Sequence, residues 1–145
     1  MIMNDNKIVL FLVDDDALFL KSLEIEFADN TESIVRSFPT GELCLEKISE
    51  NPDVVILDYY LNSIDKNAIN GLETLDRIKK TNQAIPVIIL SSQDKIEVAV
   101  NCMKHQAFDY IVKSETAFIR LQKTITTIFH YQRLEKALSW YMEKM

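Results

Sequence analysis

The chain has 145 residues and a formal net charge of −6. This length fits one domain, and the acidic balance argues against a nucleic-acid surface, which needs clustered Lys and Arg to neutralise phosphates. No run of about eighteen apolar residues is present to span a membrane. No basic start followed by an apolar stretch marks a secretory signal, so a cytoplasmic location is expected.

Glycine and cysteine are both scarce in this sequence. Gly41 and Gly71 are the two glycines, whereas the phosphate loops of nucleotide-binding enzymes need several glycines where the backbone approaches phosphate. The sequence therefore argues against a nucleotide-binding loop. Cys44 and Cys102 have no partner at metal-ligand spacing, so both are expected to be small core or boundary residues.

Predicted strands and helices alternate along the chain. The strands at 8–13, 54–57 and 87–90 are continuous apolar runs, which are typical of strands buried on both faces of a parallel sheet. The whole predicted order is strand 8–13, helix 18–28, strand 33–38, helix 41–49, strand 54–57, helix 72–80, strand 87–90, helix 95–104, strand 109–112 and a C-terminal helix.

This alternation predicts an α/β fold, namely a doubly wound, five-stranded parallel sheet with helices on both faces. Right-handed crossovers place the C-terminal ends of all the strands along the same edge of the sheet. Ligands of such sheets bind at that edge, so the residues that follow each strand are the first candidates for a functional site.

The C-terminal helix is longer than the domain needs. From residue 114 the pattern is helical to the end, and about thirty helical residues would be roughly 45 Å long, about twice what a domain of this size packs. We therefore expect a domain over residues 1–131 and a helical extension over residues 132–145. Since Leu134, Leu138, Trp140 and Tyr141 make an apolar stripe, a homodimer through a short coiled coil is expected.

Polar residues stand at the end of four predicted strands. They are Asp14, Asp15 and Asp16 after the first strand, Asp58 after the third, Ser91 and Ser92 after the fourth, and Lys113 after the fifth. Because these ends share one edge, the side chains should converge there. Massed carboxylates repel one another unless a cation lies among them, and oxygen ligands of this kind suit Mg²⁺.

This ordered set resembles the receiver domain of bacterial two-component response regulators, over residues 7 to about 129. The family pattern is an acidic pair, a lone Asp, a hydroxyl residue and a Lys after the first, third, fourth and fifth strands. The resemblance implies a (βα)5 flavodoxin-like fold. It also implies a signalling switch, not a metabolic enzyme, that takes a phosphoryl group from a sensor histidine kinase or phosphotransfer protein in a Mg²⁺-dependent reaction.

The resemblance assigns the chemistry to particular residues. Asp58 is the nucleophile and the phosphorylated residue. Asp15, Asp58 and the backbone carbonyl of Tyr60 ligate Mg²⁺, and Asp14 acts largely through water. Lys113 supplies a further cation to the transferring group.

The resemblance also implies a switch residue at each of two strands. Ser91 would hydrogen-bond a phosphoryl oxygen, after which the following loop moves inward and makes room for Tyr110 to swing in. Simpler structural roles remain open: a lone Asp after a strand is often a helix cap, and Ser91 and Ser92 could cap the next helix. Asp16 is expected to be an N-cap.

Three features depart from the family pattern. The loop at 61–70 carries about five extra residues and lacks the usual Pro. Ser114 follows Lys113 where the family has a Pro after a cis bond, so a trans bond or a strained loop is expected. Gln106 stands where the family favours Gly, so the turn after the fourth helix should differ slightly.

Other functions remain as alternatives. An aspartate-nucleophile phosphatase of the haloacid dehalogenase type uses an Asp-x-Asp pair, as Asp14 and Asp16 offer, but it also needs an acidic pair after the lysine. A receiver-like interaction module that is never phosphorylated usually lacks the Asp or Lys residues that this chain keeps. A flavin-binding protein of the same fold would need a Ser-, Thr- and Gly-rich loop after the first strand.

Overall fold

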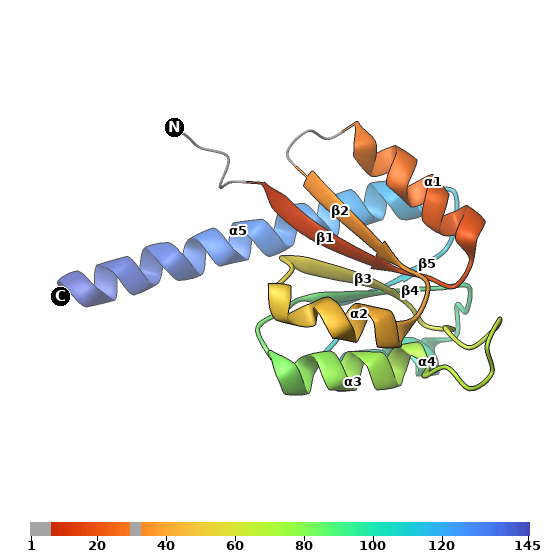
Figure 1. Ribbon diagram of the computed structural model, residues 1–145. Helices are drawn as coiled ribbons and strands as arrows, with labels where there is room; N and C mark the ends of the chain where they lie inside the picture. The colour runs from red at the N-terminus through yellow and green to blue at the C-terminus, as the bar shows by residue number, and fades with distance from the viewer. Residues whose placement is uncertain (1–6, 30–32) are drawn as a thin grey trace.

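A computed structural model describes residues 7–29 and 33–145 (Figure 1). The elements follow in the order β1 (Ile8–Val13), α1 (Ala17–Ala28), β2 (Ser33–Phe38), α2 (Gly41–Lys47), the 3₁₀ turn η2 (Ile48–Glu50), β3 (Val54–Asp58), α3 (Gly71–Thr81), β4 (Val87–Ser91), α4 (Ile96–Lys104), β5 (Asp109–Val112) and α5 (Ala117–Lys144). All the predicted strands and helices are present, with ends displaced by a few residues.

The five strands form one parallel sheet in the order β2-β1-β3-β4-β5. The predicted doubly wound α/β fold is therefore confirmed. In the pairing of β1 with β3, Val13 lies opposite Leu57, so the next residues along each strand, Asp14 and Asp58, emerge side by side. In the pairing of β4 with β5, Ser91 lies opposite Val112, directly before Lys113.

Two apolar cores lie on the two faces of the sheet, because alternate strand residues point to opposite sides. Phe11 and Val13 of β1 join the core beneath α2, α3 and α4, whereas Leu10 and Leu12 join the core beneath α1 and α5. β3 and β4 divide their side chains in the same way. Figure 1 shows these two helical layers on either side of the sheet.

The extended C-terminal helix leaves the domain after its fourth turn. Ala117, Leu121, Ile125 and Ile128 of α5 are buried against the sheet, and from Tyr131 onward every residue except Gln132 is exposed. Figure 1 shows the end of α5 reaching away from the sheet, on the side opposite to the loop between β3 and α3. In the described part of the chain, no helix is long and apolar enough to cross a membrane.

The backbone conformation is defined at two of the positions that depart from the family pattern, Ser114 and Gln106. The Lys113–Ser114 bond is trans, since residues 7–29 and 33–145 contain no cis peptide bond. Gln106, in the turn between α4 and β5, has φ 76°, a left-handed conformation in which Gly is favoured and a side chain adds strain. The chain therefore keeps a left-handed turn here although the residue is not glycine.

Candidate functional site

The predicted convergence at the sheet edge places two carboxylates against one lysine. Lys113 Nζ lies 2.9 Å from Asp14 Oδ2 and 3.3 Å from Asp58 Oδ1. Asp14 and Asp58 are 2% and 4% exposed, so both charged groups are almost fully removed from water. Burial of this kind is costly for a carboxylate unless a partner compensates its charge, and the ammonium of Lys113 is that partner.

Three carboxylates are close enough to share one cation. Asp14, Asp15 and Asp58 each offer an oxygen, and these oxygens all lie within 4.8 Å of one another. Asp14 Oδ2 is buried and accepts no hydrogen bond, so the ion pair with Lys113 alone compensates it. One lysine does not balance three carboxylates, and a cluster of hard oxygen donors fits a divalent cation such as Mg²⁺.

The electrostatics of the site raise the pKa of Asp58 to about 7. Burial is the largest cause and the charge of Asp14 the second, while Lys113 acts in the opposite direction. Burial also lowers the pKa of Lys113, but the two carboxylates together outweigh it, so the pKa of Lys113 is raised and its ammonium stays charged. Without a further cation, the carboxyl of Asp58 therefore keeps its proton to a higher pH than an ordinary aspartic acid does.

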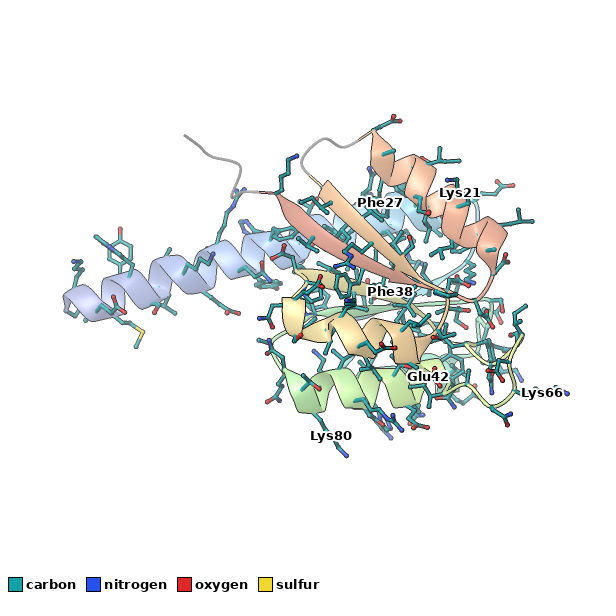
Figure 2. All side chains as sticks on the ribbon, in the orientation of Figure 1. Lys21, Phe27, Phe38, Glu42, Lys66 and Lys80 are labelled. Carbon is teal, nitrogen blue, oxygen red and sulfur yellow. The ribbon has the colours of Figure 1, made fainter. Side chains whose placement is uncertain are left out.

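The long loop between β3 and α3 holds Asp15. The backbone N–H groups of Ser63 and Ile64 donate to Asp15 Oδ2 at 3.0 Å and 3.4 Å. The loop is also tied to α2, because the N–H of Ile69 donates to Glu42 Oε2 at 3.0 Å. Figure 2 shows Glu42 near the start of α2 and Lys66 pointing outward from the loop.

Glycine is required where this loop returns to the sheet. The N–H of Gly71 donates to the carbonyl of Tyr59 at 2.9 Å. A Cβ on Gly71 would lie 2.3 Å from the backbone oxygen of Asp58, closer than any real contact. The start of α3 therefore packs directly on the chain that carries Asp58.

The observed helix caps exclude the alternative that Asp58, Ser91 or Ser92 serves as the N-cap of the helix that follows it. Asn70 caps α3 through its side chain, so Asp58 is not the cap of that helix. Lys95 stands at the cap position of α4 without a side-chain bond, so neither Ser91 nor Ser92 caps α4. Asp16 is the N-cap of α1, as predicted, accepting from the N–H groups at the second and third helical positions.

The two predicted switch residues are linked through one loop residue. Ser91 is fully buried, and its Oγ accepts from the N–H of Gln93 at 3.0 Å. The hydroxyl of Tyr110 donates to the carbonyl of Gln93 at 2.6 Å, and the residue as a whole is 9% exposed. Tyr110 thus already lies inward in this structure, and its coupling to phosphorylation stays a prediction.

Two further residues border the site: Tyr60, which was predicted, and Phe19, which was not. Tyr60 is half-buried and its ring packs edge-on against Tyr59, while the role of its carbonyl as a metal ligand stays a prediction. Sequence reasoning missed Phe19, whose ring centroid lies 4.4 Å from Lys113 Nζ. Its position three residues after the cap residue Asp16, which places it in the first helical turn beside the strand ends, was the available signal.

Comparison with known proteins places the whole site inside one family. Residues 10–126 match the family described as the response regulator receiver domain. Among curated proteins, the chain is 33% identical over 97 residues to the transcriptional regulatory protein ZraR of Klebsiella oxytoca, covering 67% of this chain and 21% of that protein. It is also 33% identical to the protein-glutamate methylesterase/protein-glutamine glutaminase of Treponema pallidum, covering 93% of this chain and 34% of that protein.

Solved structures agree with this match. A response regulator receiver domain protein from Clostridium thermocellum superimposes with a TM-score of 0.76 at 25% identity, over 88% of this chain and 98% of the other. A beryllium fluoride-activated DrrB receiver domain superimposes with a TM-score of 0.73 at 27% identity, over 86% of this chain and 98% of the other. The isolated receiver domains are thus matched over nearly their full length, whereas the chain spans about a fifth to a third of the two curated relatives.

Proposed function

This chain belongs to the response regulator receiver domain family, and from that premise we propose that it takes a phosphoryl group onto Asp58 and uses it as a signal. The observation that carries the proposal is the almost fully buried carboxylate of Asp58, with Lys113 Nζ at 3.3 Å and two further carboxylates beside it. A buried carboxylate with a raised pKa, which belongs to a cluster suited to a metal ion and lies beside a lysine ammonium, is suited to nucleophilic attack.

The proposed reaction forms an acyl phosphate on Asp58. A carboxylate oxygen of Asp58 attacks phosphorus, and the bond from phosphorus to the donor's leaving atom breaks, with the electron pair going to the donor. The ammonium of Lys113 lies 3.3 Å from Asp58 Oδ1, so it is close enough to stabilise the negative charge on the phosphoryl oxygens. A Mg²⁺ ion would be held by Asp15, Asp58 and the Tyr60 carbonyl, with Asp14 acting largely through water, and would neutralise further charge on the transferring group.

The proposed signal leaves the site through Ser91. In this structure Ser91 Oγ accepts a hydrogen bond from Gln93, so its own O–H remains available to donate to a phosphoryl oxygen. The carbonyl of Gln93 accepts from the hydroxyl of Tyr110 on the neighbouring strand β5. A shift of Ser91 and its loop would therefore displace the hydrogen-bond partner of Tyr110. This connection gives the phosphoryl group a route to the surface formed by α4 and β5.

The proposed donor is a sensor histidine kinase or a phosphotransfer protein, and the proposed output is regulation, not turnover of a substrate. Curated relatives include both a transcriptional regulatory protein and a methylesterase, so relatives with similar receivers carry different outputs. A phosphorylation-independent interaction module is the second candidate, and the inward position of Tyr110, held by its bond to Gln93, is the observation that favours it.

The projecting helix supports a further proposal about partners, a homodimer. The row of α5 that faces the core at Ile125 and Ile128 continues as Gln132, Glu135 and Ser139, so it carries no apolar surface beyond the domain. A different row is apolar, spaced by three and four residues, and more than half exposed at every position; it consists of Tyr131, Leu134, Leu138, Tyr141 and Met145. This heptad spacing fits a two-stranded coiled coil with a second copy over residues 132–145.

Intact-mass measurement after incubation with acetyl phosphate and Mg²⁺ tests the proposal. One added phosphoryl group is expected on the natural chain, and none on Asp58→Asn or in the presence of a chelator. A haloacid dehalogenase-type phosphatase would instead turn over a generic phosphoester many times per chain. If the natural chain takes up neither a phosphoryl group nor beryllium fluoride, the phosphorylation-independent module is the correct reading.

A further inference from the structure

The ammonium of Lys113 has three neighbours that can stabilise it. Two are the carboxylates of Asp14 and Asp58, and the third is the ring of Phe19, whose centroid lies 4.4 Å from Nζ. A cation within about 6 Å of an aromatic centroid is attracted by the negative face of the ring, and the attraction grows when water is excluded. The Lys113 side chain is only 19% exposed, so this contact is largely sheltered from water.

The acidic run after β1 fixes the position of Phe19. The N–H of Asp16 donates to Asp14 Oδ1 at 2.9 Å, which joins the cap residue to the acidic pair. Asp16 Oδ1 then accepts from the N–H groups of Leu18 at 3.1 Å and Phe19 at 3.2 Å. Asp14 itself pairs with Lys113, so a closed series of contacts runs from Asp14 through Asp16 and Phe19 to Lys113 and back.

Besides the two ion pairs, the ring of Phe19 is the contact that orients the Lys113 ammonium. The backbone of Lys113 is held, since its N–H donates to the carbonyl of Ser91 at 2.8 Å. The next three residues of the chain are exposed. A lysine stem has four rotatable bonds and loses much conformational freedom when its end is fixed.

We propose that Phe19 is a positioning residue for Lys113, which holds the ammonium over its ring so that the cation is in place when a phosphoryl group reaches Asp58. The inference rests on the proposed acceptance of a phosphoryl group by Asp58. A phosphoryl oxygen cannot occupy the same point as the Asp58 oxygen that Lys113 now contacts, so Nζ has to shift. A ring face permits that shift better than a carboxylate does, because its attraction is spread over the ring.

The contact itself is tested by NMR on the full chain labelled with ¹³C-lysine, without Mg²⁺ or a phosphodonor. The ring current of Phe19 should move the ε-methylene signal of Lys113 upfield, and Lys113→Arg identifies that signal by removing it. Phe19→Leu should return the signal to the normal lysine position, whereas Phe19→Tyr should keep it upfield. An unshifted Lys113 signal in the natural chain overturns the inference.

The matched control for this experiment is Phe118→Leu. Phe118 is likewise half-buried against the core beneath α1 and α5, but its ring packs against Phe27 at 5.0 Å. Phe118→Leu should therefore lower stability in a similar way without moving the Lys113 signal. If both leucine variants move the signal equally, general loosening of the core explains the effect and the inference fails.

The functional part measures the rate of phosphorylation by acetyl phosphate across donor concentrations at saturating Mg²⁺. Phe19→Leu should lower the maximal rate about 3- to 10-fold with little change in the half-saturating concentration, and Phe19→Tyr should restore it to within about twofold. Equal rates for Phe19→Leu and the natural chain overturn the inference and leave the proposed function standing. Failure of the natural chain itself to be phosphorylated overturns the proposed function, and the inference with it.

Discussion

The backbone N–H of Ser63 donates a 3.0 Å hydrogen bond to Oδ2 of Asp15, across 48 positions of sequence. The long loop between β3 and α3 is therefore not only a neighbour of the acidic cluster but an orienting partner of one carboxylate in it. Groups that hydrogen-bond a metal ligand fix its rotamer and raise the affinity of the site. The extra residues of this loop would thus affect the proposed binding of Mg²⁺.

Removal of the Ser63 donor should weaken Mg²⁺ binding. Ser63→Pro lacks the N–H and should raise the Kd for Mg²⁺ roughly tenfold, because Asp15 loses the shorter of its two backbone bonds. Ser63→Ala keeps the N–H and should leave the Kd within about twofold of the natural value. Isothermal titration of both variants makes the comparison, and equal Kd values would show that the loop does not orient Asp15.

The raised pKa of Asp58 should make stability depend on pH. The carboxyl binds its proton more tightly in the folded chain, with a pKa of about 7 against 3.8, mainly because it is buried and next because Asp14 is charged. Its contribution to stability is therefore complete below about pH 4 and is lost as pH rises through about 7. Urea unfolding of the natural chain in a chelator should show lower stability at pH 8 than at pH 5.

Asp58→Asn separates this effect from other ionisations. The amide cannot charge, so the variant should gain of the order of 2 kcal/mol over the natural chain at pH 8 and much less at pH 5. Saturating Mg²⁺ should reduce the difference at pH 8, because the cation favours the charged carboxylate. A variant that is equally or less stable than the natural chain at pH 8 would refute the assignment of this pH dependence to Asp58.

The place of the site was predictable because it follows from topology alone. Once five parallel strands are assigned, Asp14, Asp58 and Lys113 all lie along one edge of the sheet, and the register that sets Val13 opposite Leu57 brings the first two side by side. The contacts made by Phe19 and Ser63 were not predictable in this way. They depend on the direction of one side chain in a helical turn and on the path of a loop with no periodic pattern, neither of which strand order determines.

Gln106 provides a test of backbone strain away from the site. Its φ of 76° costs a residue with a side chain about 1 kcal/mol, so Gln106→Gly should raise the free energy of unfolding by roughly that amount. Asn51, with φ 56°, is the matched control, since Asn tolerates this region and Asn51→Gly should gain less. Urea unfolding measures both, and a loss of stability in Gln106→Gly would show that its side chain contributes more than the strain costs.

The projecting end of α5 should control the oligomeric state and leave phosphorylation intact. Its apolar row is on the part of the helix beyond the domain, at the edge of the sheet opposite to the loop that borders the site (Figure 1). Leu134→Glu with Leu138→Glu places charges on the second and third of the five positions of the row, so the chain should sediment as a monomer. Lys136→Glu with Lys144→Glu, which leaves the five residues of that row in place, is the control and should sediment as the natural chain does.

The decisive comparison is between the natural chain and a truncation after Tyr131. The truncation keeps every buried residue of α5, so it should fold, and it should lose the dimer if residues 132–145 form the contact. Phosphorylation by acetyl phosphate should proceed at the same rate in both, because no residue of the extension lies near Asp58. If the truncated chain still sediments as a dimer, residues 132–145 are not the dimer contact. The exposed apolar row would then need a different partner.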